Sequence, residues 1–103
     1  MVKQGDIIFI NFNPTSGSRP ALVLSNDNFN KYSSLTFVCP ITSSKRKTPF
    51  QIPLDERTKT QGCILCDQVR MVDLKSRRLS VIETLPDDIL DYTLRVFKAI
   101  IGK

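Results

Sequence analysis

The sequence predicts a mainly β domain, a small antiparallel barrel of the SH3-like type, followed by one C-terminal helix. Short segments rich in β-forming residues alternate with turn-forming residues along most of the chain. Near the C-terminus the apolar pattern changes to the period of an amphipathic helix. Strands and helices do not alternate, so a parallel sheet is not expected. The 103 residues suffice for a single domain, residues 1–103, with one core.

The expected strands are short and rich in β-branched and aromatic residues. They span residues 5–12, 21–25, 35–41, 50–54, 62–72 and 79–83. Residues 13–18 form a turn or loop by composition, and Ser25-Asn26-Asp27-Asn28 can cap a short helix that reaches about Lys31. The strand that contains Pro40 should bend, end or lie at an edge there, because proline cannot donate to a ladder.

The C-terminal helix is expected to begin after residues 84–87. Thr84-Leu85-Pro86-Asp87 matches a capping box, with Asp at the position usually held by Glu or Gln. Two adjacent apolar stripes consist of Ile89, Thr93, Val96 and Ile100, and of Leu90, Leu94, Phe97 and Ile101. Gly102 suits the end of this helix. A face this broad packs on the core, or part of it meets a second subunit.

The chain has no histidine, and this restricts the chemistry that it can perform. Ser-His-Asp hydrolysis, Cys-His hydrolysis and the paired-histidine ribonuclease mechanism are all excluded. Cys39, Cys63 and Cys66 are too few ligands for a zinc site, so we interpret them as buried thiols. If residues 62–72 form one strand, Cys63 and Cys66 point to opposite faces. We therefore expect no metal and no cofactor, and catalysis by Arg, Lys, hydroxyl, amide or carboxylate groups.

The net charge of +5, from 15 Lys and Arg against 10 Asp and Glu, favours a polyanionic partner such as nucleic acid. No apolar run reaches the roughly 20 residues that span a bilayer. The first residues do not resemble a secretory signal. We therefore expect a cytoplasmic protein with no membrane association.

Three places combine polar side chains with predicted strands. Arg19 precedes one strand, Thr42-Ser43-Ser44 follows another, and residues 67–70 lie within the long one. A guanidinium can hold two phosphate oxygens while a hydroxyl orients a third. Each feature taken alone is also typical of an ordinary surface residue or loop.

Several motifs follow one another between Gly5 and Gly102. They are Gly5-Asp6-Ile7, Arg19-Pro20-Ala21-Leu22-Val23-Leu24-Ser25, Val38-Cys39-Pro40-Ile41-Thr42-Ser43-Ser44, Pro49-Phe50-Gln51-Ile52-Pro53-Leu54 and Cys66-Asp67-Gln68-Val69-Arg70-Met71-Val72-Asp73. In this order, with the closing helix, they resemble the MazF/PemK toxins, the endoribonucleases of bacterial toxin–antitoxin pairs. The resemblance covers nearly the whole chain.

The resemblance implies a barrel of the MazF/Kid/CcdB toxin type that acts as a homodimer. It implies metal-independent, sequence-specific cleavage of single-stranded RNA, with 2′,3′-cyclic phosphate and 5′-hydroxyl ends. It also implies a cognate acidic antitoxin that covers the RNA groove, and DNA binding through the complex with this antitoxin.

The resemblance also assigns roles to single residues. Arg19 and Thr42 match the family's catalytic arginine and threonine, and Arg70 and Asp73 match the arginine and aspartate that are catalytic in some relatives. Arginine stays protonated in proteins, so Arg19 is expected to stabilise charge. Gln68 is expected to read a base or hold a phosphate. The expected RNA-capturing residues are Ser43, Ser44, Lys45, Arg46 and Lys47.

One departure from the family concerns the loop before Arg19, where only Thr15-Ser16-Gly17-Ser18 separate Pro14 from the arginine. Most relatives have a longer loop, so an altered base preference or weaker activity is expected. Two alternatives remain open. One is a gyrase-poisoning toxin of the same fold; such toxins use a C-terminal tail, whereas here only Gly102-Lys103 follow the helix. The other is a non-catalytic RNA-binding module.

Overall fold

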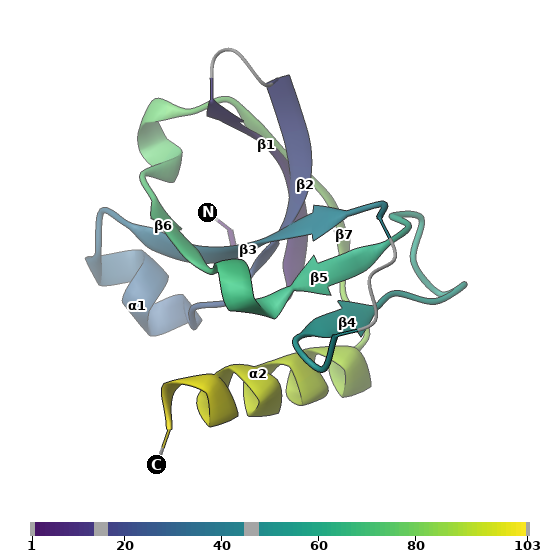
Figure 1. Ribbon diagram of the computed structural model, residues 1–103. Coiled ribbons are helices and arrows are strands. Elements are labelled where there is room, and N and C mark those ends of the chain that lie inside the picture. Colours follow the sequence, from purple (N-terminus) through teal and green to yellow (C-terminus); the bar gives the residue numbers. More distant parts are fainter. Residues whose placement is uncertain (1, 14–16, 45–47, 103) are drawn as a thin grey trace.

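The computed structural model describes residues 2–13, 17–44 and 48–102 of the chain (Figure 1). Its elements are β1 (Asp6–Asn13), β2 (Gly17–Val23), α1 (Asp27–Tyr32), β3 (Thr36–Thr42), β4 (Gln51–Pro53), β5 (Cys63–Leu65), the 3₁₀ turn η1 (Cys66–Gln68), β6 (Arg70–Val72), the 3₁₀ turn η2 (Leu74–Ser76), β7 (Leu79–Thr84) and α2 (Asp87–Ile101). All paired strands are antiparallel. The predicted mainly β fold with a C-terminal helix is confirmed. Among these elements, no helix is long and apolar enough to cross a membrane.

The strands are ordered β4-β5-β3-β2-β1-β7, and β6 pairs with β3 beside this path. Strand β3 therefore has two partners on one side: residues 36–38 pair with β6, and residues 41 and 42 pair with β5. Pro40 lies in the gap between the two paired segments. The strand continues through Pro40, but its partner changes there, which explains how a central strand accommodates a proline.

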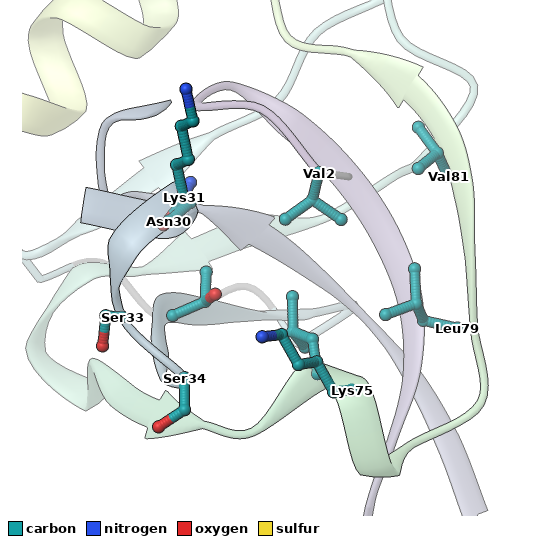
Figure 2. A pocket seen from close by; sticks show the side chains of 10 residues that line it. Val2, Asn30, Lys31, Ser33, Ser34, Lys75, Leu79 and Val81 are labelled. Atoms are coloured by element: carbon teal, nitrogen blue, oxygen red, sulfur yellow. The ribbon is translucent and has the colours of Figure 1, made fainter. Parts of the chain in front are cut away.

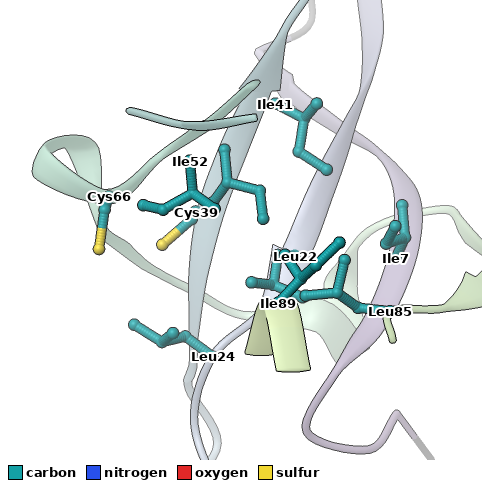
Figure 3. Close-up of a cluster of buried hydrophobic side chains, with 10 residues drawn as sticks. Ile7, Leu22, Leu24, Cys39, Ile41, Ile52, Cys66, Leu85 and Ile89 are labelled. Carbon is teal, nitrogen blue, oxygen red and sulfur yellow. The ribbon is translucent and has the colours of Figure 1, made fainter. Parts of the chain in front are cut away.

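Two apolar clusters fill the molecule, one on each face of the sheet. The first includes Ile7, Leu22 and Cys39, and the partly buried apolar side chains of α2 pack against it (Figure 3). The second lies inside the curved sheet and includes Ile8 and Val38. Successive residues of a strand point to opposite faces, so β1, β2 and β3 bury both faces. This double burial explains the apolar runs Ile7-Ile8, Ala21-Leu22-Val23 and Val38-Cys39 in the middle of these strands.

The start of α2 differs from the predicted capping box. Thr84 is the last residue of β7, and the residue that caps α2 is Pro86, which makes no side-chain cap hydrogen bond. The first turn is tied down instead by Arg57, whose Nη1 lies 2.8 Å from Asp88 Oδ1 and whose Nη2 lies 2.8 Å from Asp55 Oδ2. The hydrogen bonds from Arg57 hold the pKa of the Asp88 carboxyl group and that of the Asp55 carboxyl group below their ordinary value.

A second carboxylate orders the loop between β4 and β5. Glu83 accepts hydrogen bonds from the backbone amides of Lys59 and Thr60 at 3.0 and 2.8 Å, and from Thr60 Oγ1 at 2.8 Å. Partial burial acts to raise the pKa of Glu83, but these three hydrogen bonds outweigh it and leave the pKa below its ordinary value. The loop is thereby fixed to the edge strand β7.

The prediction of one long strand over residues 62–72 is wrong. This segment is β5, the turn η1 and β6, because the chain leaves β4 after Leu65 and rejoins β3 further along that strand. Cys63 and Cys66 therefore do not lie on opposite faces of one strand, because Cys63 is in β5 and Cys66 is in η1. All three cysteines are buried free thiols, as predicted. The neighbouring thiol of Cys66, together with burial, raises the pKa of Cys39.

Candidate active site

Arg19 and Thr42 lie at the same end of two neighbouring strands. Arg19 is an exposed residue inside β2, opposite Ile10 of β1, and does not precede the strand as predicted. Ala21 pairs with Pro40, so two residues further along the antiparallel register the chain reaches Arg19 on β2 and Thr42 on β3. Arg19 is two residues from Ala21 and Thr42 is four residues from Val38, and both Ala21 and Val38 belong to the cluster inside the sheet. Because alternate residues of a strand point to the same face, Arg19 and Thr42 point to that inner face as well. The sheet therefore directs a cation and a hydroxyl to one face at one end.

Thr42 is held by an unusually close approach of the neighbouring strand. A Cβ atom at Gly62 would lie 2.0 Å from the carbonyl oxygen of Thr42, and Gly62 has a φ of +120°, so only glycine fits there. Thr42 Oγ1 accepts a hydrogen bond from the amide of Ser44 at 3.2 Å. The hydroxyl hydrogen of Thr42 is therefore available for donation to a ligand.

Arg70 is supported by the end of β1. Its guanidinium carbon lies 5.4 Å from the centre of the Phe12 ring, a cation–π contact. Phe12 lies at the register shift of β1, where the β1–β2 ladder is irregular, two residues beyond the partner of Arg19. Arg77 fixes this irregular backbone, because its Nη1 donates to the carbonyl oxygens of Asn11 at 2.7 Å and Phe12 at 2.9 Å. The end of β1 thus links the segment that carries Arg70 to the strand pair that carries Arg19.

Asp73 is half-buried and has a structural task. Its Oδ1 accepts the amide hydrogen of Lys75 at 3.0 Å and caps η2, and its carbonyl oxygen accepts from Ser76 Oγ. A catalytic role would fall to the second carboxylate oxygen. Gln68 is exposed in η1, two residues before Arg70.

The predicted RNA-capturing residues divide into two groups. Ser43 and Ser44 are exposed directly after Thr42. Lys45, Arg46 and Lys47 lie outside the described residues. Of the predicted set, the sheet places Arg19 and Thr42 on one face at one end, and Arg70 joins them through Phe12.

Three supporting residues were not predicted as part of the site: Phe12, Gly62 and Arg77. Phe12 continues the alternation of Ile8 and Ile10, which signals its face although not its contact with Arg70. An isolated glycine beside a strand signals a close backbone approach, and this describes Gly62. Arg77 carries no local signal, because its acceptors are 65 and 66 residues away.

The chain is similar to known proteins both in sequence and in structure. Residues 3–101 match the family described as PemK-like, MazF-like toxin of type II toxin–antitoxin system. The chain is 36% identical to the endoribonuclease toxin ChpB of Escherichia coli K12, over 96% of this chain and 93% of that protein. It is 34% identical to endoribonuclease EndoA of Bacillus subtilis 168, over 88% and 86%. The MazF chain of a MazE–MazF crystal structure from Deinococcus radiodurans superposes with a TM-score of 0.88 at 33% identity, covering 98% of this chain and 95% of that one.

Proposed function

The chain belongs to the family of PemK-like, MazF-like toxins of type II toxin–antitoxin systems, and we propose on this premise that it is an endoribonuclease that cuts single-stranded RNA. The proposal is supported by Arg19 and Thr42, which lie on one face at one end of the sheet according to the β2–β3 register. The named relatives ChpB and EndoA are endoribonucleases, which supports the same reaction class.

The chemistry needs no histidine, because the RNA supplies its own nucleophile. The ribose 2′-oxygen attacks the adjacent phosphorus, the bond from phosphorus to the 5′-oxygen breaks, and a 2′,3′-cyclic phosphate and a 5′-hydroxyl result. One proton leaves the 2′-hydroxyl and one reaches the departing 5′-oxygen. The negative charge that grows on the phosphate oxygens in between is what the protein has to stabilise.

Four side chains share these tasks in the proposed mechanism. The Arg19 guanidinium binds the phosphate oxygens through paired N–H donors and stays protonated throughout. The Thr42 hydroxyl donates to another phosphate oxygen, since its own acceptor side already receives the Ser44 amide. Arg70 adds a second cation, and the free carboxylate oxygen of Asp73 is the candidate proton acceptor. Gln68, Ser43 and Ser44 contact the flanking nucleotides.

Two partners complete the proposal. The crystal structure from Deinococcus radiodurans is of a MazE–MazF pair, and this chain is proposed to bind a cognate acidic antitoxin in the same manner. The chain is also proposed to act as a homodimer. Support for the dimer comes from the apolar side chains of α2 that the single chain leaves open: Tyr92 is 48%, Ile100 40% and Ile101 66% exposed.

A cleavage assay on a mixed RNA pool in EDTA tests the proposal, with sequencing of the new ends. We expect cyclic phosphate and 5′-hydroxyl ends at a short recurrent sequence. Arg19→Ala and Thr42→Val should each lower the cleavage rate about 10²- to 10³-fold, as the loss of one charge-stabilising donor does elsewhere. Lys98→Ala, on the exposed end of α2, is the matched control and should cleave normally. Full activity in both site variants, or an intact wild-type protein that cuts no RNA, would refute the assignment.

A further inference from the structure

A hollow of about 370 Å³ opens between the end of α1, the turn η2 and the edge strand β7 (Figure 2). It is bordered by the end of α1, the start of β3, the turn η2 and the edge strand β7. Thr36 lines it at the first residue of β3, whereas Thr42 is the last residue of that strand. At the usual rise per residue the two threonines are about 20 Å apart along the strand. The β3 side of the hollow is therefore distant from Thr42, whereas on the β7 side Leu79 pairs with Ile10, the residue that also pairs with Arg19. The hollow thus borders the proposed cleavage site without containing its residues.

The floor of this hollow is aliphatic and continuous with the core. Figure 2 shows Val2, Leu79 and Val81 facing the hollow. Val2 and Leu79 belong to the cluster inside the sheet, but Val81 remains 52% exposed beside them. An apolar side chain placed here would cover Val81 and extend the core. Among the residues that the structure describes, no aromatic side chain lines the hollow, so the stacking of a nucleobase, the usual means of holding single-stranded RNA, has no platform inside it.

The rim carries two lysines and one unpaired hydroxyl group. Among the described residues, Lys31 and Lys75 line the hollow and no carboxylate does, and the ammonium group of Lys31 lies 5.5 Å from the centre of the Tyr32 ring. In Figure 2 the amino group of Lys75 extends over the hollow. Thr36 is only 5% exposed, and within the described part of the chain its hydroxyl has no hydrogen-bond partner. No completely buried side-chain oxygen of the described residues lacks a partner, so this hydroxyl reaches solvent through the hollow that Thr36 lines.

We propose that this hollow docks an acidic segment of the antitoxin, with one apolar side chain on the Val2–Val81 floor and a carboxylate facing Lys75. The inference rests on the proposed function, which supplies the antitoxin as a partner. An aliphatic floor with a cationic rim and no aromatic platform fits an acidic peptide better than RNA. The antitoxin then has an anchor beside the cleavage site, in a hollow that contains none of the proposed catalytic residues. The anchor adjoins η2, whose capping residue is Asp73.

The test uses the full chain, the purified cognate antitoxin and two variants of the hollow. Lys75→Glu reverses the charge at the rim but keeps the backbone amide that caps Asp73, and Val81→Ser removes the exposed part of the floor. Each should weaken antitoxin binding at least about tenfold by calorimetry, the loss typical of an interface anchor. RNA cleavage by the free variants should be unchanged. Lys98→Glu makes the same charge reversal on α2 and should bind within about twofold of wild type.

Unchanged antitoxin affinity in both variants would overturn the inference while leaving the endoribonuclease proposal intact. Normal antitoxin binding combined with a raised KM for RNA would overturn it in favour of RNA as the occupant. If wild-type protein cuts RNA but binds no antitoxin, the proposed partner fails, and the inference fails with it. Amide NMR shifts on titration provide a second readout. Shifts at Val2, Thr36 and Val81 are expected, and shifts confined to the region of Arg19 would contradict the anchor.

Discussion

Replacing Gly62 by alanine should damage both the fold and the cleavage site, and the structure gives the size of the effect. The new Cβ would lie 2.0 Å from the carbonyl oxygen of Thr42, whereas ordinary contact begins at 3.4 Å. The atoms it meets are backbone, including Thr42 C at 2.8 Å and Ser43 Cα at 3.1 Å, so no side chain can rotate away. The strands must separate by about 1.4 Å, which breaks the Thr42–Cys63 pairing, and φ of +120° adds strain.

We expect Gly62→Ala to lower the free energy of unfolding by about 3 kcal/mol or more, from strain at a special backbone position and lost pairing. For a domain of this size that corresponds to a fall of roughly 12–24 °C in melting temperature. Circular dichroism melting checks the stability, and RNA cleavage below the transition checks whether Thr42 has moved.

Gly102→Ala is the matched control, because Gly102 also has a positive φ, +84°, but a Cβ there would meet nothing within 4 Å. It should cost about 1 kcal/mol and leave cleavage unchanged. A Gly62→Ala variant that melts within a few degrees of the control and cleaves RNA at the wild-type rate would show that the strands accommodate the Cβ without separating.

Three further predictions follow from single contacts. Because the pKa of Glu83 is lowered in the folded state, the carboxylate contributes fully to stability above pH 4.5, the ordinary pKa of glutamate, and this contribution is lost as the pH falls through the pKa of the folded state. Glu83→Gln should therefore flatten the dependence of melting temperature on pH below about pH 4.5. Phe12→Leu keeps the bulk but removes the ring face under Arg70, which should slow RNA cleavage about fivefold, with no further loss in an Arg70→Ala background. Arg57→Gln should lower the melting temperature slightly at low ionic strength, and a difference that persists in 1 M salt would show that screening is not its cause.

Local patterns in the sequence predicted most of the secondary structure. The helix expected to reach about Lys31 is α1, and Asn26 caps it by accepting from the Phe29 amide. The strands expected over residues 5–12 and 79–83 are β1 and β7, shifted by about one residue. These elements follow from propensity and capping, which act over a few residues. The prediction of one strand over residues 62–72 is wrong because β-forming residues stand on both sides of Asp67-Gln68, whereas the division of the segment depends on which neighbours it pairs with.

The chemistry of this protein can be read from its amino-acid sequence: the lack of histidine, the positive charge and the motifs around Arg19 and Thr42. These properties are sums and short strings of residues, so no fold is needed to read them. The way in which the residues meet depends on the tertiary structure. The β2–β3 register puts Arg19 and Thr42 at one end of the sheet, and the backbone at Gly62 lies against Thr42. Arg77 donates to the carbonyl oxygen of Phe12, which is 65 residues away in the sequence. The ring of Phe12 in turn contacts Arg70. The hollow beside Lys75 arises in the same way, because contacts between distant segments depend on strand pairing and packing, which leave no local signal.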